Sequence, residues 1–291
     1  AGAITSPYQF HWQRFLFEHF PKGTGFGALD DAAAAPAIDE DALPLAEVHA
    51  YSIDDSQTTE IDDALSVTGL GTGRVTVGIH IAAPALAIAP GVALDALART
   101  RLSTVYMPGH KITMLPDAIV QRYTLAQGRA CPAVSLYVEF DEATLEQGPA
   151  RSVVERVPIA ANLRHDKLDA IVTPAWLEGS PEVEGSDLFG PQRARIGHDM
   201  LSFLYRLAQH LKHGREQVRG KPELFSRPDF NYRLQGVPEG AAPTGDETVL
   251  IDERRRGAPL DLIVAEAMIL ANNTWGQMLA EHGVPGIYRS Q

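Results

Sequence analysis

The chain has 291 residues, of which 45% are hydrophobic and 21% are charged, and this composition excludes a disordered chain. No apolar run reaches the roughly 18 residues that a membrane-spanning helix needs, and the single cysteine excludes an internal disulfide and is typical of a reducing, cytoplasmic setting. The formal net charge of −12, taken alone, argues against polynucleotide binding, because such binding usually requires a basic face.

The first part of the chain is predicted to begin with a helix and to continue as strands. Ser-Pro at residues 6–7 is a common helix start, and aromatic residues recur at helical spacing as far as residue 20. Residues 27–45 are rich in alanine, aspartate and proline, which is typical of a linker. A strand is expected at 46–53, and ALSVTGL and RVTVGIHIAAP, joined by a Gly-Thr-Gly turn, indicate a hairpin.

The remainder mixes helices and strands without regular alternation. A helix is predicted at 95–101, whereas 103–116, with two prolines, is predicted to be an irregular apolar loop. A second hairpin is expected over 134–159, and ELFSRPDFNYRL is expected to be interrupted by a turn. Long helices are predicted at 197–218 and 260–282. This order of elements indicates one mixed α/β or α+β domain with an N-terminal appendage.

Five acidic residues crowd into IDDSQTTEIDDA, residues 53–64, between two segments predicted to be strands. Asp54 ends the first strand, and Asp62 and Asp63 enter the second, so a tight loop would bring their carboxylates together. Hard cations such as Mg²⁺ prefer carboxylate oxygens, and two such ions would activate a water and stabilise the leaving oxygen of a phosphodiester. The cluster therefore indicates a metal site, in which cations would offset the repulsion between the carboxylates.

Two other interpretations of this cluster remain open. An acidic loop of this density is common as a solvated turn. A calcium loop is the second alternative, although the spacing lacks the central glycine and the bidentate glutamate of an EF-hand. His80, in VGIHIAA, and Cys131 are expected to be buried core residues, not a metal ligand and a nucleophile. No serine elbow, phosphate-binding GxxxxGK motif or paired CxxC motif is present.

Several motifs together resemble a known family. They are, in chain order, IDDSQTTEIDDALSV, VTVGIHIA, LDALARTRLSTVYMPGHKITMLP, VAEAMILANN and GIYR. In this order, over about residues 44–291, they are similar to the ribonuclease II (RNB) family of 3′→5′ exoribonucleases. The resemblance implies a mixed α/β (α+β) catalytic domain over residues 46–291, with a mixed sheet flanked by helices. Residues 1–45 would then be an N-terminal helical segment and linker.

The resemblance also implies the catalytic and metal-binding residues. The acidic quartet at the family's Mg²⁺ site corresponds to Asp54, Glu60, Asp62 and Asp63. The second position is usually aspartate in the family, so Glu60, one methylene longer, is expected to assist the three aspartates. Asp55 has no assigned counterpart. The expected cofactor is Mg²⁺, with Mn²⁺ as the alternative.

Three further residues are implied to bind RNA. Tyr106 corresponds to a tyrosine that stacks at the 3′ end of RNA, and Phe225 is the candidate for its aromatic partner. Stacking of this kind is sequence-tolerant and contributes roughly 1–3 kcal/mol per base. Glu266 falls where family members carry an acidic pair that contacts the last nucleotide, and Ala265 takes one place of that pair here. Packing in a core is the alternative role for both aromatic residues.

The sequence also departs from the family pattern. Ala83 stands where an acidic residue usually follows HIA, and a basic segment with a catalytic arginine is not found after GIYRSQ. The chain is therefore expected to be a fragment, incomplete at its C-terminus, of a longer monomeric protein that carries OB-fold modules. Such modules commonly supply the basic grooves for RNA, which would explain the acidic charge of this piece.

The leading hypothesis is hydrolysis of single-stranded RNA from its 3′ end to nucleoside 5′-monophosphates, in the cytoplasm and without a membrane. A non-catalytic RNB-like protein that binds RNA or a protein partner is the alternative from another class, and Ala83 favours it. An acidic metal-binding scaffold without nucleic acid is the third. The Asp62–Asp63 pair favours the enzyme, because a binding surface has no need to concentrate charge there.

Overall fold

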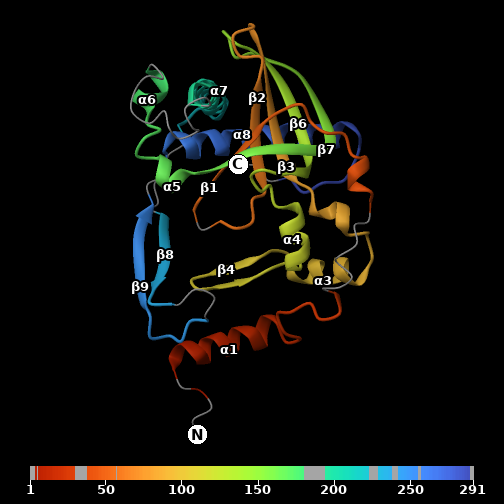
Figure 1. Ribbon diagram of the computed structural model, residues 1–291, viewed down its shortest axis with the longest axis vertical. Helices are drawn as coiled ribbons and strands as arrows, with labels where there is room; N and C mark the ends of the chain where they lie inside the picture. Colours follow the sequence, from red (N-terminus) through yellow and green to blue (C-terminus); the bar gives the residue numbers. More distant parts are fainter. Residues whose placement is uncertain are drawn as a thin grey trace. The chain divides into compact units, whose positions relative to one another are not determined.

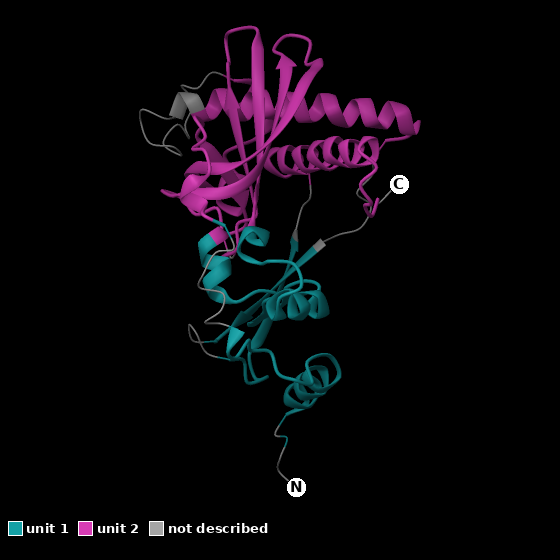
Figure 2. Cartoon of the chain, turned by 90° about the vertical axis from the view of Figure 1, so that its right-hand side faces the viewer, with its two compact units in different colours: residues 1–38, 84–122, 226–255 teal, residues 39–83, 123–225, 256–291 magenta. Residues whose placement is uncertain are grey.

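The computed structural model describes residues 4, 6–29, 38–56, 58–179, 194–222, 229–237, 242–254 and 257–288. The chain divides into two compact units, each assembled from three separate stretches of sequence (Figure 2). Unit 1 comprises 1–38, 84–122 and 226–255, and unit 2 comprises 39–83, 123–225 and 256–291. The domain boundary expected at residue 45 stays a prediction.

Unit 2 contains a closed five-stranded barrel (Figure 1). Its strands, in the order of pairing, are β1 (Ala50–Asp54), β2 (Asp63–Thr68), β3 (Arg74–Ala82), β6 (Ala130–Asp141) and β7 (Gln147–Arg164). Neighbours pair antiparallel, except that β7 returns to β1 in parallel. The sheet is therefore mixed, and both predicted hairpins, β2–β3 and β6–β7, are confirmed.

Alternating apolar residues build the barrel core. In β3, Val75, Val77 and Ile79 are at most 2% exposed, and they lie opposite buried residues of β6. Residues two apart point to the same side of a strand, so this alternation places one face of β3 in the core. Burial of such side chains contributes about 1.5–3 kcal/mol each.

Two long helices, α7 (Ala194–Arg219) and α8 (Pro259–Glu281), pack with the barrel strands in one core. Leu201 and Leu204 of α7 and Leu260 and Ile263 of α8 are buried in it. Both helices were predicted and are confirmed. Unit 2 also contains η1 (Glu40–Ala42), α5 (His165–Leu168) and α6 (Pro174–Glu178). Among the described residues, no helix combines the length and the apolar character needed to cross a membrane.

His80 is a buried core histidine of β3, as predicted. Its Nε2 lies 2.8 Å from the Ser66 hydroxyl and its Nδ1 lies 2.8 Å from the Ser135 hydroxyl, so both ring nitrogens have partners on neighbouring strands. Burial lowers the pKa of His80 to about 4. Cys131 is likewise buried, and its thiol donates to the Thr124 carbonyl at 3.4 Å.

Unit 1 is assembled around an N-terminal helix and two small hairpins. Its elements are α1 (Pro7–His19), η2 (Pro84–Ala87), α3 (Ala93–Arg101), β4 (Val105–Met107), β5 (His110–Ile112), β8 (Asp229–Gln235) and β9 (Thr248–Arg254), and α4 (Asp117–Tyr123) leads from it into unit 2. Ser6 caps α1, because its hydroxyl accepts from the Gln9 amide. The His110 ring of β5 stacks on Trp12 of α1 at 4.3 Å between ring centroids.

The prediction for residues 103–116 was wrong in part, because they contain the β4–β5 hairpin. Each strand has three residues, which is too short for an alternating pattern to be recognised. A turn was expected within ELFSRPDFNYRL, residues 223–234. Residues 223–228 lie outside the described part of the chain, and residues 229–235 form the continuous strand β8 (Asp229–Gln235). Among the described residues, β8 pairs only with β9. Most side chains on both faces of this hairpin are exposed, so β8 lacks the alternation of apolar and polar residues by which a half-buried strand is predicted.

Candidate active site

The acidic cluster lies where β1 ends and β2 begins. Asp54 closes β1, Asp63 opens β2, and the two strands pair antiparallel. Antiparallel neighbours place the end of one strand beside the start of the next, so Asp54 and Asp63 lie at the same end of the barrel. The loop between them carries Glu60 and Asp62.

Ile61 fixes the second half of this loop. Its side chain is 4% exposed and packs in a small core with residues of β1, β2, β6 and β7. Its amide donates to the Thr124 hydroxyl at 2.8 Å, and its carbonyl accepts from the Leu125 amide at 2.9 Å. Because Ile61 is held in this core, its neighbours Glu60 and Asp62 are held close to Asp54.

The carboxylates are close enough to act on one another electrostatically. Burial, and then the charges of Asp54 and Asp62, raise the pKa of Asp63 to about 6. Burial, and then the charges of Glu60 and Asp54, raise the pKa of Asp62. Burial also raises the pKa of Asp54, against the opposing effects of a Ser52 hydrogen bond and the Arg164 charge. The fold thus gathers all four carboxylates that the sequence singled out.

The donor chemistry of the cluster fits a hard divalent cation. Asp54 Oδ2 is buried and has no hydrogen-bond partner, which is unusual for a carboxylate oxygen and is satisfied when a cation binds. In the described part of the chain, however, no three His, Cys, Asp or Glu side chains are arranged to hold one metal ion. The residues therefore match Mg²⁺ or Mn²⁺ in ligand type, whereas their side-chain positions do not form a closed ligand set.

Comparison with known proteins decides the family. A family model, the RNB domain, matches residues 43–291. The chain belongs to the RNB family. It is 29% identical over 269 residues to an uncharacterized ribonuclease of Synechocystis, covering 88% of this chain and 34% of that protein. It is 30% identical over 240 residues to Exoribonuclease 2 of Edwardsiella piscicida, covering 81% and 33% respectively.

The fold is that of RNB nucleases of known structure. The chain superposes on Mycoplasma genitalium RNase R in complex with ribose-methylated single-stranded RNA with a TM-score of 0.64, at 17% identity, covering 93% of this chain and 37% of that one. The RNB chain thus spans about a third of the length of the curated relatives that it matches.

Asp55, the fifth acidic residue of the RNB motif, is directed differently from the other four. Its side chain lies 4.0 Å from His165 Nε2, and its backbone carbonyl accepts from Arg164 Nη1 at 2.8 Å. Both partners stand where β7 passes into α5. Asp55 therefore belongs to a contact between the loop and α5, not to the group of four carboxylates.

Tyr106 lies on the β4–β5 hairpin of unit 1, opposite Lys111. Side chains alternate across a hairpin, so Tyr106 lies on the face opposite that of His110, which stacks on α1. The Tyr106 side chain is 66% exposed and does not pack in a core of this unit. Phe225, its expected aromatic partner, lies outside the described residues.

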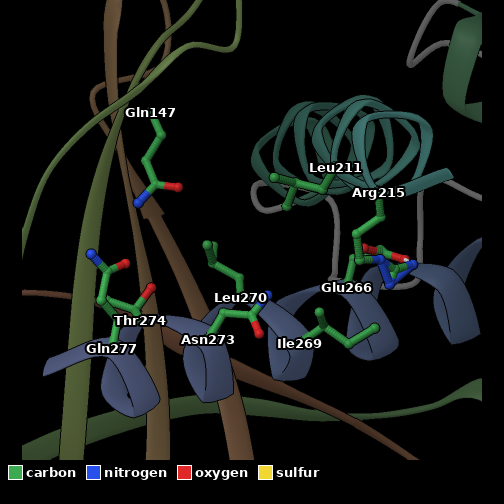
Figure 3. Close-up of a pocket in the computed structure, with 9 residues that line it drawn as sticks. All are labelled: Gln147, Leu211, Arg215, Glu266, Ile269, Leu270, Asn273, Thr274 and Gln277. Atoms are coloured by element: carbon green, nitrogen blue, oxygen red, sulfur yellow. Dashed lines mark hydrogen bonds and ion pairs between the residues drawn. The ribbon is translucent and has the colours of Figure 1, made fainter. Parts of the chain in front are cut away.

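Glu266 of α8 is 3% exposed and faces α7 (Figure 3). Arg215 Nη2 donates to its Oε1 at 2.6 Å. The two residues line a pocket of about 220 Å³, together with Gln147, Leu211, Ile269, Leu270, Asn273, Thr274 and Gln277. Ala265, the neighbouring position, is exposed instead. The carboxylate of Glu266 is engaged by an arginine, and its contact with a nucleotide stays a prediction.

Sequence reasoning missed the residues that hold the first half of the acidic loop. Arg164 and Asp166 lie about 110 positions after that loop and form no motif with it. The parallel return of β7 to β1 places Arg164 opposite Asp54. The one local signal is the charged run RHDKLD, which begins five residues after the end of the strand predicted to finish at residue 159.

Proposed function

We propose that the chain is part of the catalytic region of a 3′→5′ exoribonuclease that degrades single-stranded RNA processively to nucleoside 5′-monophosphates. The observation that carries this proposal is the convergence of Asp54, Glu60, Asp62 and Asp63 at one end of the barrel, where burial raises the pKa of the three aspartates and neighbouring carboxylates raise those of Asp62 and Asp63 further. Membership of the RNB family and similarity to Exoribonuclease 2 support the same conclusion.

The three aspartates would hold Mg²⁺, or Mn²⁺ in its place, with Glu60 assisting. When bound, such a cation lowers the pKa of a water and offsets the charge that develops on the phosphodiester. The buried Oδ2 of Asp54, which has no hydrogen-bond partner among the described protein groups, gives the site an oxygen ligand. Burial, and then the charges of Asp54 and Asp62, raise the pKa of Asp63 to about 6, so a bound cation would favour its ionised form.

RNA would be bound through its bases as well as its backbone. Tyr106 offers an exposed ring on which a base can stack, and Phe225 is its proposed partner. Glu266 is proposed to contact the terminal nucleotide, which requires it to leave Arg215. The related RNase R was solved with single-stranded RNA, which supports the same substrate class here. OB-fold modules, a monomeric state and a cytoplasmic location complete the proposal for the whole protein.

A non-catalytic RNB-like RNA-binding or protein-interaction domain is the second candidate. Ala83, buried directly after β3, lacks the acidic side chain expected there. The four carboxylates also form no closed ligand set in the described residues. A protein of this class would bind RNA without shortening it.

The experiment that separates the two functions uses RNA labelled at its 5′ end. The full-length gene product and the 291-residue chain are incubated with single-stranded RNA and Mg²⁺, beside Asp63→Asn. Asp199→Asn, on α7 and 48% exposed, is the matched control. If the protein is the enzyme, wild type and the control should shorten the labelled RNA to a short oligonucleotide, and Asp63→Asn should leave it intact. Intact RNA with wild-type full-length protein would support the binding function instead.

A further inference from the structure

The first half of the acidic loop is held by one arginine at the end of β7. Arg164 Nη1 donates to the Asp55 carbonyl at 2.8 Å and to the Thr58 carbonyl at 3.1 Å. The Thr58 amide also donates to the Asp55 carbonyl at 3.0 Å, which closes a turn. Arg164 therefore joins Asp55 to Thr58, and it does so from the position opposite Asp54 in the β1–β7 pair.

An aspartate at the start of α5 makes the second contact. Asp166 Oδ1 accepts from both the amide and the hydroxyl of Ser56, each at 2.8 Å. Two donors from one residue to one oxygen fix the backbone as well as the side chain of Ser56. Asp166 and Arg164 thus hold three residues between Asp54 and Glu60, with the Asp166 contact at Ser56 lying between the two Arg164 contacts.

These contacts oppose the repulsion within the cluster. Asp62 and Asp63 are close enough to Asp54, and Asp62 to Glu60, for their negative charges to repel one another. The second half of the loop is anchored by Ile61 inside the barrel. Arg164 and Asp166 hold Asp55, Ser56 and Thr58, which lie between Asp54 and Glu60, so removing these hydrogen bonds should loosen the backbone that positions Glu60 beside the aspartates.

We propose that Arg164 and Asp166 are positioning residues that hold the loop from Asp55 to Glu60 and thereby set the affinity of the four carboxylates for a divalent cation. This inference rests on the proposed function, because it concerns the same cation site. Neither residue is a ligand: each acts through hydrogen bonds to the loop. Residues that orient metal ligands in this way typically change metal affinity by about 10–100-fold when they are removed.

The hydrogen-bonding role makes a specific prediction for conservative variants. An asparagine at position 166 keeps an oxygen that accepts from Ser56, whereas an alanine does not. Asp166→Asn should therefore bind a cation like wild type, and Asp166→Ala should not. Arg164 donates to both carbonyls through Nη1. A lysine at 164 keeps the charge, but its ammonium lies one bond nearer the backbone than Nη1 and does not reach both carbonyls, so Arg164→Lys should behave like Arg164→Met.

The test measures Mn²⁺ binding by electron paramagnetic resonance and hydrogen exchange of the amides of Ser56 and Thr58, both on the full-length gene product. Asp166→Ala and Arg164→Met should weaken Mn²⁺ binding about 10-fold and speed exchange of these amides. Ser56→Ala, a milder change, should do both to a smaller extent. Arg151→Met is the matched control, because Arg151 also lies on β7 but stacks over the Tyr137 ring.

Each outcome decides the question. Wild-type Mn²⁺ affinity in Asp166→Ala, with unchanged exchange, would overturn the proposal. Equal loss of affinity in Asp166→Asn and Asp166→Ala would overturn it as well, because the charge and not the hydrogen bonds would then matter. Failure of the wild type to bind Mn²⁺ would refute the proposed function itself, whereas tight binding by wild type and every variant would refute only the positioning role.

Discussion

Neutralising Asp63 should stabilise the cation-free protein while it abolishes the proposed activity. Burial and two neighbouring carboxylates raise the pKa of Asp63 from 3.8 to about 6. Each pKa unit corresponds to about 1.4 kcal/mol of unfavourable interaction with the ionised form, so at pH 7 the charge costs about 3 kcal/mol of folding free energy. Asp63→Asn keeps the size of the side chain and removes the charge, and its free energy of unfolding should rise by up to that amount.

The assay is urea unfolding of wild type and Asp63→Asn in EDTA, from pH 7.5 to pH 4. A carboxyl whose pKa is raised in the folded state is destabilising when ionised, so the wild type recovers stability as the pH falls from about 6 to 3.8. The advantage of Asp63→Asn should therefore be largest at pH 7.5 and should shrink across that window. Added Mg²⁺ should stabilise the wild type more than the variant, because only the wild type keeps the full ligand set.

Two results would refute this reasoning. One is an Asp63→Asn variant that is no more stable than wild type in EDTA at pH 7.5. The other is an advantage that does not change with pH. Asp199→Asn, at an aspartate of the same unit that is 48% exposed and lies 3.5 Å from His198 Nδ1, should lie within about 0.5 kcal/mol of wild type and controls for removal of a surface carboxylate.

Three further predictions concern other parts of the molecule. Burial lowers the pKa of His80 to about 4, so the folded protein favours the neutral ring. The stability advantage of wild type over His80→Gln should be full above pH 6.5 and should decline as the pH falls toward 4. An NMR titration of the ring with its midpoint near pH 6.5 would contradict this. Tyr106→Ala should weaken binding of single-stranded RNA by about 1–3 kcal/mol in a fluorescence titration. Phe17→Ala, at another exposed aromatic residue of unit 1, should leave binding unchanged. Equal effects of the two substitutions would contradict a stacking role for Tyr106. Arg215→Met should lower the free energy of unfolding by about 3 kcal/mol, because it removes the guanidinium that faces the buried Glu266 carboxylate. The double variant Arg215→Met with Glu266→Gln should recover most of that loss. A double variant as unstable as Arg215→Met would show that the uncompensated charge of Glu266 is not the cause.

The elements that could be predicted are those whose pattern is local. The β2–β3 hairpin follows from alternation around a glycine-rich turn, and α7 and α8 follow from apolar residues repeated over several turns. The three-residue strands β4 and β5 give too few positions for a pattern. The parallel pairing of β7 with β1, which closes the barrel, joins segments about 110 residues apart and leaves no mark in either of them.

The candidate site divides in the same way. Asp54, Glu60, Asp62 and Asp63 lie within ten residues of one another, so their convergence could be predicted from one motif between two strands. The contacts that hold their loop come from Arg164 at the far end of β7, and only the closed barrel brings it there. The burial of Glu266 against Arg215 depends equally on the packing of two helices that are distant in sequence.

The central claim is that the four carboxylates direct water onto the terminal phosphodiester of RNA. The most direct measurement is mass spectrometry of the products formed from single-stranded RNA by the full-length protein with Mg²⁺ in H₂¹⁸O. The account predicts nucleoside 5′-monophosphates that carry one ¹⁸O on phosphorus, since the oxygen of water bonds to phosphorus and the 3′-oxygen leaves, and it predicts none of them with Asp63→Asn. Nucleoside 3′-phosphates, cyclic phosphates or intact RNA from the wild type would contradict it.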